Sequence, residues 1–244
     1  MIENALILAA GTGSRLKPLT DHAPKCLTEI NGVPILENTL NNLLYNSIER
    51  CTIVTGYLSD AIQDTIGIRY NDISITYLYN EHYANTNDMF SLWLAREILH
   101  EGTVLLEGDI FFRPETLKMA ITQMDRKSCY LAGKYNGKEN EILITTDSNN
   151  KVRSIEVLRD NKAGEIKQSN YMSSGMLIIQ DTYGKYFSEW LTEFVNNKKV
   201  NLLFDDVLSA YATAANLYIF EIQHNEWVEV DILQDVGEAE RVFA

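Results

Sequence analysis

Two glycines and two basic residues near the start of the chain form a pattern that could bind a phosphate group. Gly11 and Gly13 follow an apolar run at residues 5–10, and Arg15 and Lys25 come shortly after them. Glycine lets backbone N–H groups approach an anion closely, and the two basic side chains would place positive charge on the same group. Such a loop is a weak signal by itself, because glycines also serve tight turns and basic residues are mostly solvated.

The spacing in this loop excludes two common phosphate-binding motifs. A dinucleotide fingerprint needs a third glycine where this sequence has Leu16, and a P-loop needs a Gly-Lys-Ser/Thr run that the sequence lacks. The local charge still favours an anion. Residues 1–25 carry a net charge of +1, which leaves −14 for the rest of a chain whose net charge is −13. A small anion would be attracted to this one positive region.

Acidic residues at two other places could bind a metal ion or a cationic group. Glu107 and Asp109 end an apolar run, and their spacing puts both carboxylates on one face of an extended strand. Asp109 is too far from the helix expected near Pro114 to cap it, which favours metal binding. Glu107 could hold an ammonium group or assist the metal. Asp231 stands at a predicted strand-to-helix junction, where an aspartate is often only a cap.

Strands and helices alternate through the first half of the chain, and this order would bring these residues to one edge of a sheet. Short β-branched runs predict strands, and apolar residues at three- and four-residue spacing predict helices between them. We expect strands at residues 5–10, 51–55, 73–77 and 103–107, and helices at residues 35–46, 58–66 and 88–100. This pattern is typical of a parallel sheet covered on both faces, where ligands bind beyond the carboxyl ends of the strands.

The second half contains more strands, joined by polar turns. Strands are expected at residues 129–132, 141–146, 152–158, 172–179, 217–222 and 227–231, and helices at residues 182–195, at 205–215 and at the end of the chain. We therefore predict an α/β fold, a Rossmann-like doubly wound mixed sheet with a partly antiparallel C-terminal half. The sequence contains neither an internal repeat nor a linker, which predicts a single domain over residues 1–244 whose character changes near residue 125.

Composition and charge exclude several classes of function. Hydrophobic residues make up 45% of the chain, which is ample for a core, and a net charge of −13 disfavours binding to nucleic acid or an anionic membrane. The apolar run at residues 5–10 is too short for an anchor and lacks the basic residues of a leader, so we expect a soluble cytoplasmic protein. Three widely spaced cysteines predict reduced thiols, and no covalent hydrolase motif is present.

The stretch LAAGTGSRLKPLTDHAPK, residues 8–25, resembles the N-terminal motif of nucleotidyltransferases, which join a nucleoside monophosphate to a small phosphorylated substrate. Within that superfamily the chain is similar to the CTP:phosphocholine cytidylyltransferase group and its relatives that act on aminoalkylphosphonates. The likeness continues in order through residues 55–58, 83–92, 107–109 and 230–231. The resemblance implies an enzyme that transfers CMP from CTP to a small phosphorylated or phosphonate acceptor and releases pyrophosphate.

The resemblance also implies a role for individual residues. It implies that Lys25 and Arg15 are catalytic and that Asp109 and Asp231 are ligands of a Mg²⁺ cofactor. The nucleotide-binding residues, mostly within a half that spans about residues 1–125, would be Leu8, Ala9, Ala10, Gly11, Thr12, Gly13, Ser14, Gly56, Tyr57, Asn85, Thr86 and Asn87. The acceptor would contact Glu107, Glu156 and Tyr171, and the acceptor-binding half would span about residues 126–244. From the residues alone, Tyr57 could be ordinary packing and Asn87 a helix N-cap.

One departure from the group's pattern concerns the acceptor. Its phosphocholine enzymes carry a tryptophan in the strand that corresponds to residues 140–143, where this sequence has Ile142 and Leu143. A quaternary ammonium usually needs an aromatic cage, which Tyr130, Tyr135, Tyr171 or Trp227 would then have to supply. A primary ammonium, as in 2-aminoethylphosphonate or phosphoethanolamine, could instead be held by carboxylates such as Glu107 or Glu156.

Two other functions fit the same residues. One is a sugar- or polyol-1-phosphate nucleotidyltransferase that uses CTP, UTP or dTTP, although the chain lacks the β-helix repeats that some sugar-linked relatives append. The other is a nucleotide-binding protein without turnover. The presence of Arg15, Lys25, Asp109 and Asp231 together argues against it, because binding alone would not require two metal carboxylates.

Overall fold

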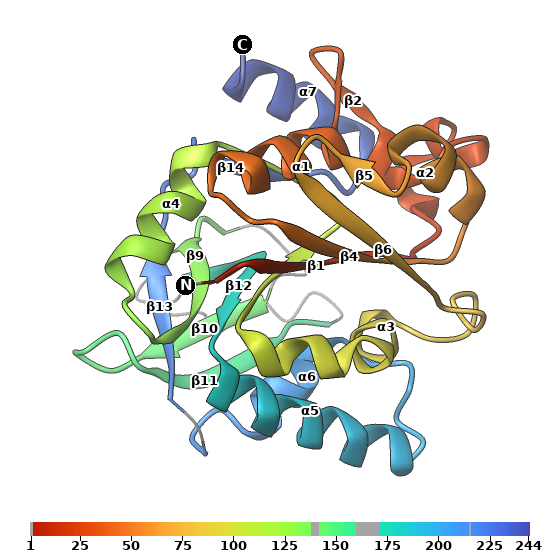
Figure 1. Ribbon diagram of the computed structural model, residues 1–244. Helices are drawn as coiled ribbons and strands as arrows, with labels where there is room; N and C mark the ends of the chain where they lie inside the picture. Colours follow the sequence, from red (N-terminus) through yellow and green to blue (C-terminus); the bar gives the residue numbers. More distant parts are fainter. Residues whose placement is uncertain (1, 138–141, 160–170, 215) are drawn as a thin grey trace.

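A mixed β-sheet runs through the middle of the molecule and carries helices on both faces (Figure 1). The structure is a computed structural model that describes residues 2–137, 142–159, 171–214 and 216–244. In these residues ten strands form the sheet, in the order β11-β10-β12-β7-β1-β4-β6-β5, and β9 and β13 join it through β12. This arrangement confirms the predicted mixed α/β fold.

Parallel strands form the centre of the sheet. They are β1 (Asn4–Ala9), β4 (Arg50–Thr55), β6 (Ile73–Tyr79) and β7 (Thr103–Glu107), and β1 lies between β4 and β7. Every residue of β1 is buried, with Ala5 and Ile7 in one apolar core and Leu6 and Leu8 in the other. The continuous apolar run therefore belongs to a strand that is covered on both faces, as predicted.

Helices cover the two faces of the sheet in separate groups (Figure 1). One face carries α1 (Ile35–Tyr45), α2 (Ser59–Ile66) and α4 (Pro114–Gln123), and the other carries α3 (Asp88–Leu94), α5 (Asp181–Asn196) and α6 (Phe204–Ala210). Leu36, Leu40 and Leu43 recur at helical spacing on α1 and are buried in the first core, as Phe187 and Leu191 of α5 are in the second.

Antiparallel strands extend the sheet beyond β7. β12 (Tyr171–Ile179) pairs antiparallel with β7 and with β9 (Ser128–Lys134), while β10 (Ile142–Thr146) links β12 to β11 (Val152–Val157). β13 (Leu217–Glu221) runs parallel to β9, and β5 (Arg69–Tyr70) forms the opposite edge. The partly antiparallel second half is thus confirmed, although residue 141, where one strand was predicted to begin, lies outside the described residues.

A small second sheet attaches the end of the chain to the end of β7. β8 (Ile110–Phe112) pairs antiparallel with β14 (Trp227–Glu229), which places Glu229 opposite Ile110. The N–H of Val230 donates a 2.9 Å hydrogen bond to the carbonyl of Asp109. This pairing, followed by α7 (Leu233–Val242), brings two acidic segments together that are more than a hundred residues apart in sequence.

The structure differs from the prediction at several short elements. The helix predicted at residues 88–100 ends at Leu94 and continues as a 3₁₀ segment, Arg96–Glu101. There α5 packs so closely that a Cβ on Gly184 would overlap the Leu99 carbonyl oxygen. The hairpin of β2 (Glu29–Ile30) and β3 (Val33–Pro34) was not predicted, because two-residue strands carry no periodic signal. Among the described residues, no helix is long and apolar enough to cross a bilayer.

Candidate active site

A cavity of about 580 Å³ opens beyond the carboxyl ends of β1 and β7. This is the place where open α/β sheets bind ligands. Most of the residues predicted to form the site line it, namely Leu8, Ala9, Ala10, Gly11, Thr12, Gly13, Ser14, Arg15, Lys25, Thr86, Asn87, Glu107, Asp109 and Asp231. The fold therefore brings together residues from both ends of the chain.

The glycine-rich loop has a backbone shape that requires glycine at one position and leaves open space at the other. Gly13 is in the left-handed region with φ 60°, and a Cβ there would lie 2.8 Å from the Cβ of Lys25. The hydroxyl of Thr20 donates a 2.8 Å hydrogen bond to the Gly13 carbonyl. A Cβ on Gly11, in contrast, would meet no atom within 4 Å. The loop is thus held at Gly13 and leaves room for a ligand at Gly11.

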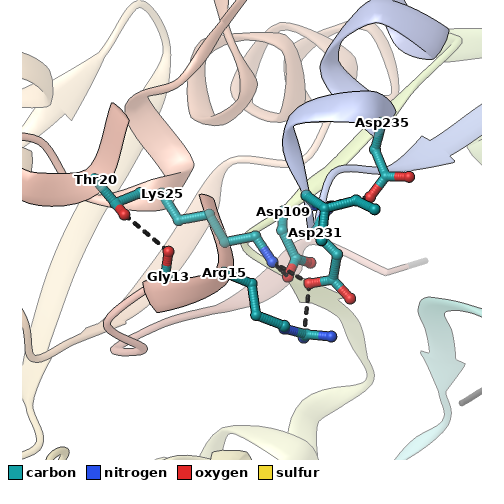
Figure 2. A network of polar contacts seen from close by, with 8 residues as sticks. Gly13, Arg15, Thr20, Lys25, Asp109, Asp231 and Asp235 are labelled. Atoms are coloured by element: carbon teal, nitrogen blue, oxygen red, sulfur yellow. Dashed lines mark hydrogen bonds and ion pairs between the residues drawn. The ribbon is translucent and has the colours of Figure 1, made fainter. Parts of the chain in front are cut away.

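Lys25 is the centre of an ion-pair network that joins this loop to the carboxylates (Figure 2). Its Nζ lies 2.6 Å from Oδ2 of Asp109 and 2.5 Å from Oδ1 of Asp231, and only 15% of its side chain is exposed. Nη2 of Arg15 lies 2.9 Å from the same Asp231 oxygen, but its side chain is 65% exposed. Burial alone would lower the pKa of Lys25, but the two carboxylates outweigh it and raise the pKa. The ammonium therefore stays charged.

Asp231 is fixed at the start of α7 by the backbone on either side of it. One carboxylate oxygen of Asp235 accepts 2.8 Å hydrogen bonds from the N–H groups of Asp231 and Ile232. Ile232 holds the N-cap position of α7. The side chain of Asp231 points towards Lys25 and Arg15, which agrees with a site residue better than with the alternative of a simple cap.

Three carboxylates could hold a divalent metal ion at this end of the cavity. Single oxygens of Glu107, Asp109 and Glu229 lie within 4.8 Å of one another. Oδ1 of Asp109 is buried and accepts no hydrogen bond from the described residues. Burial, followed by the charges of Asp109 and Glu229, raises the pKa of Glu107 well above its ordinary value. An unpaired buried oxygen among crowded carboxylates fits a hard cation, which binds oxygen ligands and would offset the repulsion.

Two further carboxylates line the cavity, Asp88 in the first turn of α3 and Asp205 in the first turn of α6. We call this pair the acidic floor. Asp205 is fully buried, and its Oδ1 accepts a 2.8 Å hydrogen bond from the hydroxyl of Tyr130. That hydroxyl in turn accepts one of 2.8 Å from Ser173. Oδ2 of Asp205 accepts none from the described residues. Oδ1 of Asp88 accepts a 2.8 Å hydrogen bond from the Phe204 N–H. In each floor carboxylate, therefore, Oδ1 accepts a hydrogen bond from the protein.

The environment of the acidic floor disfavours negative charge. Burial raises the pKa of Asp205 to about 7, a shift that the hydrogen bond from Tyr130 partly opposes. The pKa of Asp88 is raised by burial and then by the nearby charge of Asp205. Among the described residues that line the cavity, Tyr83 is the only aromatic one. A cationic group in this part of the cavity would relieve the repulsion between the two carboxylates.

Comparison with known proteins agrees with this geometry. The family model described as nucleotidyl transferase matches residues 4–242. The chain belongs to the nucleotidyl transferase family. It is accordingly an enzyme of that class, with the mixed α/β fold of its structural neighbours.

Relatives of this nucleotidyl transferase include both groups that the sequence resembles. The 2-aminoethylphosphonate cytidylyltransferase of Lancefieldella rimae is 26% identical over 236 residues, which cover 96% of this chain and 90% of the relative. The choline-phosphate cytidylyltransferase of Haemophilus influenzae is 30% identical over 237 residues, with coverage of 95% and 94%. The solved CTP:phosphocholine cytidylyltransferase of Streptococcus pneumoniae has a TM-score of 0.81 at 24% identity, over the full length of both chains. The resemblance noted in the sequence is confirmed.

Some residues predicted for the nucleotide site are not among the described residues that line the cavity of this nucleotidyl transferase. A Cβ on Gly56 would lie 2.6 Å from the Cβ of Tyr83 and 2.7 Å from the Ala10 carbonyl oxygen, so glycine is needed for close packing there. The hydroxyl of Tyr57 donates a 3.0 Å hydrogen bond to the Thr20 carbonyl, behind the glycine-rich loop. Asn85 is exposed in the turn before α3. Gly56 lines a second cavity that shares Tyr83 with the first, so contact of Gly56 and Tyr57 with a nucleotide stays a prediction.

Other predictions concern the polar run before α3 and the acceptor side. Asn87 lines the cavity and also caps α3, because its side chain accepts a hydrogen bond from the Asp88 N–H. Glu156 is exposed on β11, beside the buried Ile155. Tyr171 is buried, and its hydroxyl donates a 3.0 Å hydrogen bond to Glu221. The described lining of the cavity does not include Glu156 or Tyr171.

Sequence reasoning missed three acidic residues of the cavity, Asp88, Asp205 and Glu229. Glu229 stands two residues before Asp231, the same spacing that pointed to Glu107 and Asp109, so this signal was available. Asp88 and Asp205 sit in the first turns of helices, where acidic residues are common for reasons of helix polarity alone. Their role becomes visible only when the packing of α3 against α6 brings them to the cavity.

Proposed function

We propose that the protein is a Mg²⁺-dependent cytidylyltransferase that transfers CMP from CTP to a small phosphonate or phosphomonoester bearing a primary ammonium group, and releases pyrophosphate. Relatives with cytidylyltransferase names along nearly the whole chain support the nucleotide assignment. The observation that carries the acceptor assignment is the acidic floor of Asp88 and Asp205, which lies in the same cavity as the glycine-rich loop.

The nucleotide would lie over the loop from Leu8 to Ser14. Backbone N–H groups of this loop would approach the phosphates where Gly11 leaves open space. Asp109 and Asp231 would hold Mg²⁺, with Glu107 and Glu229 close enough to assist. When bound, the metal would neutralise part of the charge that the phosphates bring to a cavity already lined by carboxylates. The unpaired buried oxygen of Asp109 supports this assignment.

The proposed reaction is an in-line substitution at the α-phosphorus of CTP. An anionic oxygen of the acceptor forms a new bond to the α-phosphorus. The bond between the α-phosphorus and the oxygen that bridges to the β-phosphate breaks, and pyrophosphate leaves with the electron pair of that bond. A phosphate monoester needs no general base, because its second pKa is about 6 and it is largely ionised near neutral pH. Lys25 and Arg15 would stabilise the negative charge gathered at the α-phosphate.

The acidic floor would bind the far end of the acceptor. A primary ammonium has three N–H donors and could donate to carboxylate oxygens of the floor, such as the unpaired Oδ2 of Asp205, whereas a quaternary ammonium has no N–H donor. Of the four aromatic residues that could have formed a cage, Tyr130, Tyr171 and Trp227 are buried, and Tyr135 is half-buried and absent from the described lining of the cavity, which includes Ile142. Asn140 and Glu141 lie outside the described residues. The polarity of the described lining thus favours an aminoalkyl acceptor over phosphocholine.

A panel of acceptors with CTP and Mg²⁺ tests this proposal, with pyrophosphate release as the readout. It would comprise 2-aminoethylphosphonate, phosphoethanolamine, phosphocholine, glucose 1-phosphate and inositol 1-phosphate, and CTP would be replaced by UTP or dTTP in parallel. We expect kcat/KM for a primary ammonium acceptor to exceed that for phosphocholine at least tenfold. A preference for phosphocholine or for either sugar-type phosphate would overturn the acceptor assignment, and a preference for UTP or dTTP would overturn the nucleotide assignment.

A further inference from the structure

The ammonium of Lys25 contacts both carboxylates, Asp109 and Asp231, that the proposed function assigns to a metal ion. Its Nζ lies 2.6 Å and 2.5 Å from one oxygen of each carboxylate. The oxygens concerned are Oδ2 of Asp109 and Oδ1 of Asp231, whereas Oδ1 of Asp109 accepts no hydrogen bond from the described residues. A metal ion that used these two oxygens would have to displace the ammonium from them.

We propose that Lys25 is the resident cation of the nucleotide-free site, and that a nucleoside triphosphate must draw its ammonium away before a divalent metal binds Asp109 and Asp231. The inference deepens the proposed function and rests on it, because it takes these two carboxylates as the metal ligands. Its consequence is that metal affinity is low without nucleotide and rises when nucleotide binds, a positive coupling between two ligands of one site.

The contact of Lys25 with the two carboxylates is shielded from water. The side chains of Lys25, Asp109 and Asp231 are only 15%, 17% and 18% exposed, so water screens their attraction much less than at a surface pair. Arg15 also reaches Asp231, but an exposed ion pair of this kind contributes little. Lys25 is therefore the cation whose removal would change the affinity of the site for a metal.

Lys25 is also placed so that its ammonium can leave without a change of fold. Its Cβ lies against the glycine-rich loop, 2.8 Å from where a Cβ on Gly13 would be. A lysine ammonium is a point charge on a flexible four-carbon stem. Rotation about that stem would carry it from the carboxylates to a phosphate on the loop. The phosphate would compensate the ammonium, and the metal would compensate the carboxylates.

Direct metal binding to the nucleotide-free protein tests the proposal. Wild type and Lys25→Met would be titrated with MnCl₂, and free Mn²⁺ would be measured by its electron paramagnetic resonance signal. We expect Lys25→Met to bind one Mn²⁺ at least tenfold more tightly than wild type. Lys17→Met is the matched control, because Lys17 pairs with Asp21 at 3.1 Å but is 59% exposed and does not line the cavity. It should keep the wild-type affinity.

A second variant and a second readout keep the test decisive. Lys25→Gln should bind Mn²⁺ more tightly as well, and the added Asp231→Asn change should cancel the gain. Mn²⁺ should raise the unfolding temperature of both Lys25 variants and leave that of wild type nearly unchanged, because stabilisation by a ligand increases as its dissociation constant falls. Equal Mn²⁺ affinity in wild type and in whichever Lys25 variant folds would overturn the proposal. No CTP or acceptor is present, so this result is independent of the acceptor panel.

Discussion

The hydroxyl of Tyr130 donates a 2.8 Å hydrogen bond to Oδ1 of Asp205, and both side chains are fully buried. This one bond does not compensate for the burial of a carboxylate, which raises the pKa of Asp205 to about 7. The residue therefore costs stability at neutral pH. Such a cost is typical of a group retained for binding, since function and stability often conflict at a site.

We predict that Asp205→Asn stabilises the protein at alkaline pH while it removes acceptor binding. The folded pKa of about 7 lies above the ordinary aspartate pKa of 3.8, so the free energy of unfolding falls as pH rises from about 4 to 7 and is then flat. Asparagine removes this dependence and can still accept from Tyr130. The gain in unfolding free energy should be on the order of 3 kcal/mol at pH 8 and clearly smaller at pH 5.

Urea unfolding at both pH values measures this effect. Asp72→Asn is the control, because Asp72 is highly exposed and its substitution should change the unfolding free energy by less than about 0.5 kcal/mol at either pH. A loss of stability at pH 8 in Asp205→Asn would show that the buried carboxylate is compensated in the protein.

Lys25→Ala is expected to fold and to lose most of its turnover. Removal of one charge-stabilising group typically lowers kcat by about two to three orders of magnitude. Circular dichroism would confirm the fold, and pyrophosphate release with the preferred acceptor would give kcat. Lys17→Ala, on the same loop but outside the cavity, should keep a kcat within about twofold of wild type. Turnover near the wild-type level in Lys25→Ala would remove Lys25 from the proposed catalytic residues.

Asp109→Asn should weaken the binding of the metal ion that activity requires. The substitution removes one of the carboxylates around the candidate metal position and leaves an amide of nearly the same shape. We expect the Mg²⁺ concentration for half-maximal activity to rise at least tenfold, because charge dominates the binding of hard cations. Asp64→Asn, on an exposed position of α2, serves as the control. An unchanged Mg²⁺ dependence in Asp109→Asn would exclude Asp109 as a metal ligand.

The parts of the fold that the sequence predicts are those with a long local pattern. β1 and the helix face of Leu36, Leu40 and Leu43 are continuous or periodic over several residues, and each was recognised. β8 and β14 have three residues each, and their pairing joins segments far apart in the chain. No local signal can reveal such a pairing, although it decides which carboxylates meet.

The candidate site also contains residues that a local sequence pattern predicts and residues that only tertiary packing brings together. Gly11, Gly13 and Lys25 belong to one contiguous motif, whose spacing suffices to recognise it. The acidic floor of Asp88 and Asp205 is created by tertiary packing between α3 and α6, so each residue looks like ordinary helix polarity in sequence. The floor is also the part of the site that we propose to select the acceptor, so the local sequence pattern does not identify the acceptor.

The two glycines of the loop should respond to alanine in opposite ways. At Gly13 the left-handed backbone and the close Cβ of Lys25 leave no room for a methyl group, so Gly13→Ala should destabilise the protein by about 1 to 3 kcal/mol. At Gly11 a methyl group would meet no protein atom within 4 Å, so Gly11→Ala should unfold at the wild-type urea concentration. Its methyl group would instead project into the space proposed for the phosphates. Calorimetry should show CTP affinity reduced at least tenfold in Gly11→Ala, and wild-type affinity there would place the phosphates elsewhere in the cavity.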